Sequence, residues 1–363
     1  MVSQTPADYM SRALALAARG RARTSPNPMV GALVVSVDDV VVGQGFHERV
    51  GEAHAEVRAL EMAGPRARGA TLYCTLEPCS HVGRTGPCVV RIVEAGIARV
   101  VAAVEDPNPL VSGQGFAYLR AHGIIVDVGL GAAAARRLNE GFFTLMQERR
   151  PFVILKAALS ADWCLAEAPD RQTWLTSAAA DRHAHAVRAE IDAIGVGVGT
   201  VLVDDPLLNV RGVYRERPLT RVVFDRRLRT PPASRLLSTR DAGPVIIVTS
   251  AAAASCMDLR GPLEARGAEV EVAPDATLRS ALERLGTRQI ETLLLEGGAA
   301  VHDAAWDEGV ADFVRLYMTP RVIGPGGLRF LEGRGFDHRA LFERREERLD
   351  PDVMIEGYVH RPR

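Results

Sequence analysis

The chain has 363 residues, of which 47% are hydrophobic and 25% charged, a composition typical of a soluble protein with large cores. This length favours two domains. Lysine and arginine number 44 and aspartate and glutamate 45, so no excess of positive charge indicates a nucleic acid or an anionic membrane as partner. Small molecules are therefore the expected ligands.

No targeting or membrane segment is evident in the sequence. The first ten residues lack the basic and then apolar layout of a signal peptide, and no apolar run reaches the roughly 18 residues of a spanning helix. We therefore expect a cytoplasmic protein. The five cysteines, an odd number in a long chain, indicate metal ligands or buried thiols rather than a disulfide framework. Only Cys79 and Cys88 lie in a metal-like context.

The first part of the chain is predicted to alternate helices with short strands. A helix is expected after the N-cap candidate Thr5, with Pro6 at its first position and Gly20 at its end. The patterns that follow predict a hairpin over 29–37 and 40–45, a helix over 53–63, a strand over 70–76, a helix over 87–95, a strand over 98–104, and one more helix and strand within 117–131.

A charged segment that ends in proline, residues 147–151, marks the expected domain boundary. We therefore expect one domain over 1–147 and a second over 151–363. Beyond the boundary, apolar runs of β-forming residues alternate with alanine-rich or charged helical stretches, which predicts a mainly parallel α/β sheet. These runs cover 152–159, 192–198, 219–225, 244–250, 268–272, 290–295 and 311–318.

Three candidate metal ligands lie in the first domain: His54, Cys79 and Cys88. Two thiolates and one imidazole leave the fourth position of a zinc ion open, which is typical of catalytic sites. His54 and Cys88 each lie at the predicted start of a helix, so two helix N-termini would converge on the metal and lower the pKa of the thiols. The sequence therefore predicts one catalytic zinc ion per chain.

Glu56 is the candidate proton shuttle of this site. On a helix, residues two apart differ by roughly 200°, so His54 and Glu56 can serve one site only if it lies beyond the helix N-terminus. Zinc makes water nucleophilic near neutral pH, and Glu56 would then carry its proton to a departing amino group. A lone histidine or cysteine would be an ordinary side chain, but this ordered combination is typical of zinc nucleobase deaminases.

The spacing of the two cysteines makes the comparison more specific. Eight residues separate Cys79 from Cys88, where many deaminases have two. With Ser-Pro-Asn-Pro-Met-Val-Gly at 25–31, Gly-Phe-His at 45–47 and Leu-Glu-Pro-Cys-Ser-His at 76–81, this segment resembles the bifunctional deaminase/reductase family of riboflavin biosynthesis. The resemblance implies a cytidine-deaminase-like α/β/α domain that deaminates 2,5-diamino-6-(5-phosphoribosylamino)-4(3H)-pyrimidinone with zinc.

The same resemblance implies roles for individual residues. The three ligand candidates match the family's zinc ligands, and Glu56 matches its proton shuttle. Asn27 matches a substrate contact, and its amide can donate to and accept from a ring edge, although a turn asparagine is an equally good interpretation. His47, His81 and Arg84 are candidates for holding the ring or the ribose phosphate, with solvated loop side chains as the alternative.

Motifs after residue 151 resemble the reductase domain of this family, which has a dihydrofolate-reductase-like α/β fold and reduces the ribosyl group to ribityl with NADPH. The motifs are Leu-Lys-Ala-Ala-Leu-Ser at 155–160, the segment 197–211 and Leu-Leu-Glu-Gly-Gly at 294–298. Lys156 is a candidate to polarise a carbonyl or imine, and Arg188 and Arg211 are candidates to bind the substrate phosphate.

Further site residues are implied by the resemblance. The glycines before a predicted helix offer backbone N–H groups to cofactor phosphates, although a glycine pair there is usually only a turn. The candidate cofactor contacts are Ala158, Trp174, Thr200, Asp204 and Gly298. The candidate substrate contacts are Gln172, Leu208 and Glu296.

The second domain also departs from the family pattern. Ser-Ala-Asp-Trp at 160–163 stands where Ser-Leu-Asp-Gly is common, so Trp163 replaces a glycine that leaves room for the backbone. Gln172 and Arg226 each replace a serine, and the charge of Arg226 makes it a candidate partner for the 2′-phosphate of NADPH. These departures leave open a second hypothesis, an active deaminase joined to a reductase-like domain that is catalytically impaired.

A third hypothesis is a nucleic-acid base deaminase with an accessory binding domain. The near-neutral charge and the 5% aromatic content argue against it, because single-stranded nucleic acid is bound by basic, aromatic-rich surfaces. We expect neither a nucleic acid nor a membrane as partner. Members of the resembled family commonly self-associate, so a homo-oligomer is expected.

Overall fold

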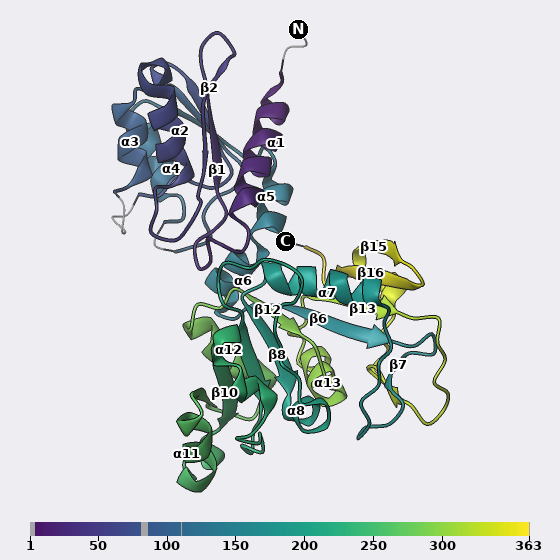
Figure 1. Cartoon of the computed structure of the whole chain (residues 1–363). Coiled ribbons are helices and arrows are strands. Elements are labelled where there is room, and N and C mark those ends of the chain that lie inside the picture. The colour runs from purple at the N-terminus through teal and green to yellow at the C-terminus, as the bar shows by residue number, and fades with distance from the viewer. Residues whose placement is uncertain (1–3, 81–85, 110, 363) are drawn as a thin grey trace. The chain divides into compact units, whose positions relative to one another are not determined.

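The computed structural model in Figure 1 describes residues 4–80, 86–109 and 111–362. The chain divides into two compact units, which meet in the sequence between Glu148 and Arg149. Among the described residues, no helix combines the length and the apolar character needed to cross a bilayer.

The first unit is built on a five-stranded mixed sheet. Its strands are β1 (Gly31–Val35), β2 (Val41–Phe46), β3 (Thr71–Cys74), β4 (Arg99–Ala102) and β5 (Ile125–Val128). Their order is β2-β1-β3-β4-β5, with β1 antiparallel to both neighbours and β3, β4 and β5 parallel. The helices are α1 (Pro6–Ala17), η1 (Ala18–Gly20), α2 (Ala55–Ala63), η2 (Gly64–Ala67), α3 (Cys88–Glu94), α4 (Gln114–Ala121), α5 (Ala132–Leu138) and α6 (Glu140–Glu148).

Helices cover both faces of this sheet (Figure 1). A Cβ at Gly31 would lie 2.0 Å from the carbonyl oxygen of Ala13 in α1, and a Cβ at Gly45 would lie 2.5 Å from that of Ala55 in α2. Gly45 pairs with Ala32, the neighbour of Gly31, so the two glycines face opposite sides of the sheet. The close approach of both helices gives the α/β/α arrangement expected from the sequence.

Local signals place the helix ends of the first unit. Thr5 caps α1 and forms a capping box with Asp8, and Pro6 occupies the first turn, as predicted. The predicted hairpin, helices and strands of this unit are all present. Two helices close to the boundary, α5 and α6, were not predicted from the sequence.

The second unit is built on a nine-stranded sheet. Its strands are β6 (Phe152–Leu159), β8 (Ala193–Gly197), β9 (Thr220–Phe224), β10 (Val245–Ser250), β11 (Ala268–Ala273), β12 (Thr292–Leu295), β13 (Phe313–Met318), β15 (Phe342–Leu349) and β16 (Asp352–Tyr358). The order is β11-β10-β9-β8-β12-β6-β13-β16-β15, and the first seven run parallel. The predicted mainly parallel sheet is therefore confirmed.

The remaining elements of this unit are helices and a small ribbon. The ribbon pairs β7 (Cys164–Ala166) with β14 (Leu328–Arg329). The helices are α7 (Ala178–Glu190), α8 (Val198–Asp204), α9 (Arg235–Ser238), η3 (Arg240–Ala242), α10 (Ala251–Ala254), α11 (Met257–Ala265), α12 (Leu278–Thr287), α13 (Ala299–Asp307) and η4 (His338–Ala340). Each apolar core cluster of the described residues draws its members from one unit only.

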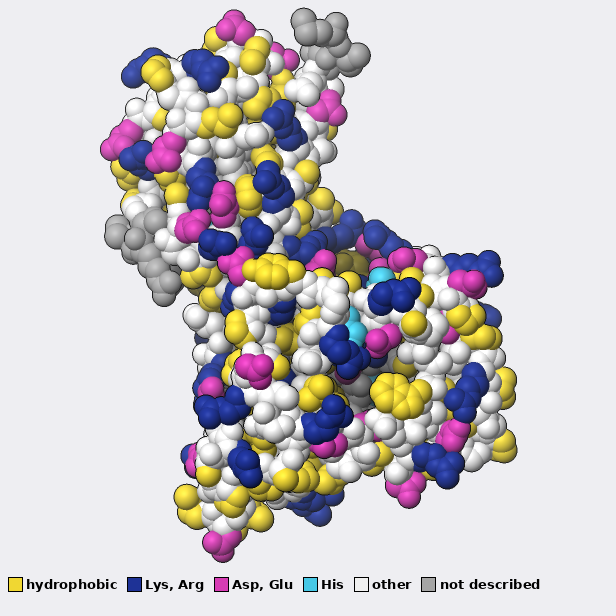
Figure 2. All heavy atoms as spheres, viewed as in Figure 1, with side chains coloured by type: hydrophobic (Ala, Val, Ile, Leu, Met, Phe, Trp, Pro, Cys, Tyr) yellow, Lys and Arg dark blue, Asp and Glu magenta, His cyan; other side chains and the backbone are white. Residues whose placement is uncertain are grey.

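Basic and acidic side chains are mixed over the face seen in Figure 2. This mixing agrees with the net charge of −1. The visible face therefore offers no extended basic surface of the kind that nucleic acids require.

Candidate active sites

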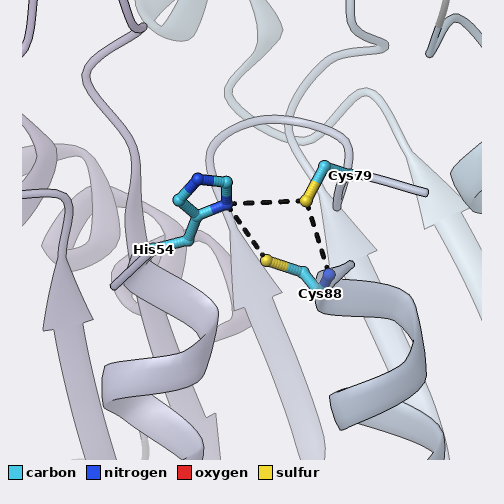
Figure 3. A group of neighbouring side chains, drawn as sticks. All are labelled: His54, Cys79 and Cys88. Atoms are coloured by element: carbon cyan, nitrogen blue, oxygen red, sulfur yellow. Dashed lines mark hydrogen bonds between the residues drawn. The ribbon is translucent and has the colours of Figure 1, made fainter. Parts of the chain in front are cut away.

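Three side chains of the first unit converge on one point (Figure 3). His54 is the N-cap of α2, Cys88 is the first residue of α3, and Cys79 lies on the loop after β3. His54 Nδ1 lies 3.3 Å from Cys88 Sγ and 3.5 Å from Cys79 Sγ. Within the described residues, these form the one group of three or more potential ligands whose donor atoms all lie within 4.8 Å of one another.

The donor set and its spacing fit a zinc ion. With Zn–S near 2.3 Å and Zn–N near 2.0–2.1 Å, tetrahedral geometry places sulfur and nitrogen ligands roughly 3.6 Å apart. The observed separations of 3.3 and 3.5 Å are close to this value. Three protein ligands leave one position for water or substrate, as in catalytic sites.

Helix geometry places Glu56 at the same site without making it a ligand. Because His54 is the N-cap, Glu56 falls in the first turn of α2, which agrees with the prediction that the site lies beyond the helix N-terminus. Its side chain is 3% exposed, and burial raises the pKa of Glu56 to about 7. Hydrogen bonds from Cys88 lower the pKa of Cys79, which favours its thiolate form.

Two of the predicted substrate contacts lie beside these ligands. Asn27 Nδ2 lies 3.2 Å from His47 Nε2, and the ring of His47 meets the ring of His54 edge-on, with centroids 5.4 Å apart. Asn139 holds the Asn27 loop, since its side chain accepts from the N–H of Met29 and donates to the carbonyl of Met29. The predicted contacts His81 and Arg84 lie outside the described residues.

The second unit contains a cavity of about 680 Å³ at the carboxyl ends of β8, β9, β10 and β12. Ligands of open parallel sheets bind at this edge. Its lining includes five of the predicted contacts: Thr200, Asp204, Arg226, Glu296 and Gly298. Two predicted cofactor contacts, Ala158 in β6 and the 77% exposed Trp174, are not part of this lining.

The start of α13 forms one wall of this cavity. Gly297 has φ +139°, a conformation that side chains with a Cβ rarely adopt, and Gly298 is the N-cap of the helix. The N–H of Gly298 donates to Thr200 Oγ1 at 3.0 Å, which ties α13 to α8. A helix N-terminus exposed in a cavity favours an anionic group such as a phosphate.

A buried carboxylate joins two predicted site cations. Glu296 accepts two hydrogen bonds of 2.6 Å from Arg188 and lies 3.4 Å from Lys156 Nζ. Burial alone would raise the pKa of Glu296, but the charges of Arg188 and Lys156 lower it to about 2. Arg188, predicted to bind the substrate phosphate, also donates to the carbonyl of Asn209. Glu296 therefore fixes the positions of both cations.

Comparisons with known proteins follow the same division into two parts. The family described as the RibD C-terminal domain matches residues 151–355, and the cytidine and deoxycytidylate deaminase zinc-binding region matches residues 3–104. The riboflavin biosynthesis protein RibD of Aquifex aeolicus is 39% identical over 361 residues, covering 98% of this chain and 99% of the relative. The chain belongs to the RibD family.

Other RibD proteins agree with this assignment. RibD of Escherichia coli is 39% identical over 329 residues, covering 87% of this chain and 88% of the relative. RibD of Acinetobacter baumannii superposes with a TM-score of 0.84 at 35% identity, covering 98% and 99% of the two chains. A diaminohydroxyphosphoribosylaminopyrimidine deaminase/5-amino-6-(5-phosphoribosylamino)uracil reductase from Thermotoga maritima gives 0.81 at 34% identity, covering 96% and 97%. This chain is thus a RibD-type deaminase/reductase of riboflavin biosynthesis.

The remaining predicted contacts of the RibD reductase half lie on loops. Leu208 is buried with φ +50°, and the N–H of Arg211 donates to His185 in α7. The side chain of Arg211 lies 3.7 Å from Asp181 Oδ2. Gln172 is exposed. The 208–211 segment therefore packs against α7, the helix that also presents Arg188.

Trp163, the main departure from the RibD pattern, packs beside the small ribbon. It adopts φ +66°, the left-handed conformation that glycine tolerates best. Its ring stacks on His338 at 5.2 Å and meets Phe336 at 6.0 Å. It is not among the residues that line the cavity. The ring therefore belongs to an aromatic cluster and does not line this cavity.

Sequence reasoning missed Glu77, which precedes the Pro-Cys motif. Its carboxylate accepts hydrogen bonds of 2.8–3.3 Å from four backbone N–H groups: Asp106, Gly113, Gly115 and Phe116. These bonds tie the Cys79 loop to the start of α4. The signal available in the sequence was a glutamate between the predicted strand over 70–76 and the Pro-Cys motif.

Proposed function

We propose that residues 1–147 of this RibD-family chain deaminate 2,5-diamino-6-(5-phosphoribosylamino)-4(3H)-pyrimidinone, and that residues 151–363 then reduce the ribosyl group to ribityl with NADPH. The observation that carries the first half is the cluster of His54, Cys79 and Cys88 with Glu56 buried beside it. The observation that supports the reductase activity is the cavity of the second unit, which Gly298 lines.

In the deaminase half, His54, Cys79 and Cys88 would hold the zinc ion. When bound, zinc supplies activation of water for attack on a ring carbon. Glu56 takes the proton from that water and delivers it to the departing amino group, because it lies at the site without being a ligand. Asn27 and His47 orient the ring, and we assign His81 and Arg84 to the ribose phosphate.

In the reductase half, NADPH would lie in the cavity, with Thr200, Asp204 and Gly298 along it and Ala158 and Trp174 at its margins. The cofactor supplies the hydride. Lys156 donates a proton or a hydrogen bond to the substrate group that accepts it, while Glu296 keeps the ammonium in place. We assign the substrate to Arg188, Arg211, Leu208 and Gln172.

Two broader properties belong to the same proposal. We place the enzyme in the cytoplasm, because its substrate is a small soluble phosphate ester. We also propose a homo-oligomer, as in the resembled family. Light scattering coupled to size exclusion at micromolar concentration tests the oligomer, and a monomer mass would overturn it.

Product analysis tests the two activities directly. The pure zinc-loaded protein is incubated with the diaminopyrimidinone ribosyl phosphate, with and without NADPH, and the products are identified by mass spectrometry. We expect ammonia and the uracil product without NADPH, and a product with two further hydrogens when NADPH is present. Deamination without NADPH-dependent reduction would support the impaired-reductase alternative instead.

Glu56→Gln tests the proton shuttle. The variant removes the proton acceptor but keeps the side-chain size and leaves all three ligands, so we expect kcat for deamination to fall by about 10²–10⁴. Zinc content, measured by plasma emission spectrometry, should stay at the wild-type level. Ammonia release at the wild-type rate would reject this role.

A further inference from the structure

Two side chains of α7 hold the backbone of the loop that follows α8. His185 Nδ1 accepts a hydrogen bond of 3.1 Å from the backbone N–H of Arg211. Arg188 donates a hydrogen bond of 3.1 Å to the backbone carbonyl of Asn209. Because His185 and Arg188 are one helical turn apart in α7, they lie on the same face of the helix. The backbone of Arg211 therefore has a fixed place on this face of α7.

His185 accepts this hydrogen bond as a neutral ring. Its side chain is 2% exposed, and burial together with the charges of Arg188 and Arg211 lowers its pKa, against the opposing charges of Asp181 and Glu296. With Nδ1 as the acceptor, the ring proton lies on Nε2. Nε2 has no hydrogen-bonding partner among the described residues, and Asp181 Oδ1 lies 3.8 Å away from it. The bond to the N–H of Arg211 is therefore the contact that this buried ring makes.

The side chain of Arg211, in contrast to its backbone, is available to a ligand. It is 55% exposed, and its nearest carboxylate is that of Asp181, which is 54% exposed and lies 3.7 Å away. Exposed ion pairs of this kind contribute little free energy, so an anionic group of a ligand can take the place of the carboxylate. The position of the guanidinium group therefore depends on the backbone of Arg211, which His185 holds.

We propose that His185 is a positioning residue of the reductase: by holding the N–H of Arg211, it places the guanidinium group of Arg211 at the phosphate of the substrate. The inference rests on the proposed reductase function, in which Arg211 contacts the substrate. A guanidinium group binds phosphate oxygens through pairs of N–H groups in a fixed plane, so a shift of its backbone weakens this contact. His185 is buried and acts through Arg211, so its loss should weaken substrate binding and leave hydride transfer nearly unchanged.

Steady-state kinetics of the full-length chain test this assignment. KM and kcat for reduction are measured at saturating NADPH with 5-amino-6-(5-phosphoribosylamino)uracil and with the same compound without its phosphate. In His185→Leu, which offers no acceptor to Arg211, we expect KM for the phosphorylated substrate to rise about 10-fold and kcat to stay within about threefold. KM for the compound without phosphate should also stay within about threefold, because Arg211 has no phosphate to bind there.

A double-mutant cycle separates positioning from a merely structural role. Arg211→Ala alone should raise KM for the phosphorylated substrate about 10-fold or more. Adding His185→Leu to Arg211→Ala should raise this KM by less than about twofold further, because His185 acts through the side chain that is already gone.

Two further variants guard against a general loss of structure. His185→Asn carries a side-chain oxygen that can accept in place of Nδ1, so it should keep KM within about threefold of the wild type. Arg182→Leu is the matched control, because Arg182 is an exposed residue of the same helix. It should leave KM and kcat for both compounds unchanged. If His185→Leu does not fold, His185→Gln takes its place in the cycle, because the longer glutamine puts its oxygen near the position of Nε2 rather than Nδ1.

The possible outcomes separate this inference from the proposed reductase function. If the wild type reduces neither compound with NADPH, the proposed function fails and this inference fails with it. If the wild type reduces both compounds with the same KM, or if the effects of His185→Leu and Arg211→Ala add up, the reductase function stands and His185 does not place Arg211 at the phosphate. A rise in KM that is confined to the phosphorylated substrate and absent from the Arg211→Ala background supports the assignment.

Discussion

The candidate zinc ligands show how residue-level chemistry depends on where each side chain leaves the backbone. His54 projects from the residue before α2 and Cys88 from the first residue of α3, so both point away from their helices toward one spot. Cys79 reaches the same spot from a loop, and the N–H of Cys88 donates to its sulfur at 3.4 Å. The start of α3 stabilises the thiolate of Cys79. The hydrogen bond with Cys79 and burial raise the pKa of Cys88, so the lowering predicted for both thiols holds for Cys79 only.

Replacing one sulfur ligand should release the metal. We expect Cys79→Ser and Cys88→Ser to retain about a tenth of the wild-type zinc or less, because a serine hydroxyl stays protonated and is a poor zinc ligand. Zinc per chain after dialysis gives the readout. Cys256→Ser is the control, because Cys256 is exposed and outside the cluster. Full zinc content in both ligand variants would reject the site.

At the scale of single elements, the start of α4 depends on one carboxylate from another segment. Gly113, the N-cap of α4, provides no side-chain cap, and Glu77 accepts from the N–H groups there instead. Unsatisfied N–H groups at a buried helix start are costly. Glu77 therefore replaces the local cap and ties α4 to the metal loop.

Removing this charge should destabilise the first unit. For Glu77→Gln we expect the free energy of unfolding in urea to fall by about 2–3 kcal/mol, because the amide has one acceptor oxygen in place of two charged ones. Glu105→Gln is the matched control. Among the described residues, Glu105 accepts a single, exposed hydrogen bond, from Ser112, so the loss in Glu105→Gln should stay within about 0.5 kcal/mol. Equal effects of the two variants would show that Glu77 is not the cap of α4.

Helix α13 contains a buried histidine that should make stability depend on pH. His302 packs against Phe330 and lies 3.3 Å from the carbonyl of Leu295, and burial lowers its pKa to about 4. The unfolded chain takes up this proton near pH 6.5, so it binds more protons than the folded chain between pH 6.5 and 4. The contribution of neutral His302 to the free energy of unfolding is therefore fully present above pH 6.5. It is lost as the pH falls from 6.5 toward 4.

The expected size of this effect is about 2 kcal/mol between pH 7 and pH 5. In His302→Leu, which cannot titrate, the loss of unfolding free energy over this range should be smaller than in the wild type by that amount. Denaturant unfolding at the two pH values measures the difference. The same pH dependence in variant and wild type would show that His302 titrates normally in the folded state.

At the scale of the whole molecule, the two units are separate structures on one chain. The core of the first unit draws on residues up to Phe143, and the cores of the second begin at Val153. The last helix of one unit ends at Glu148 and the first strand of the next begins at Phe152. Each unit therefore has the apolar interior that it needs to unfold cooperatively by itself.

Zinc removal should affect one unit only. We expect two transitions in differential scanning calorimetry and, after chelation, a fall in Tm of about 10 °C in one of them, because zinc binds only the folded first unit. NADPH should raise the Tm of the other. Restoring zinc should restore the first transition. A single transition that shifts with both ligands would show that the units unfold together.

Much of this fold was readable from short-range patterns in the sequence. Capping residues such as Thr5, and the apolar runs of the parallel strands, act over a few positions, so the sequence itself locates those elements. Strand β15 escaped prediction because its sequence, Phe-Glu-Arg-Arg-Glu-Glu-Arg-Leu, is charged and most of it is exposed at the sheet edge. Charges suit an edge strand but erase the apolar signal that identifies a strand.

The sequence by itself predicted the candidate zinc donor set, the candidate proton shuttle and the two-part organisation, because each depends on residue chemistry and on spacing along the chain. Only the tertiary structure decided which distant segments contact each other. Arg188 and Glu296 pair across 108 positions, Glu77 caps a helix 38 positions away, and Trp163 packs its ring against His338 and Phe336. Such contacts depend on sheet order and on the course of loops, which no local pattern encodes.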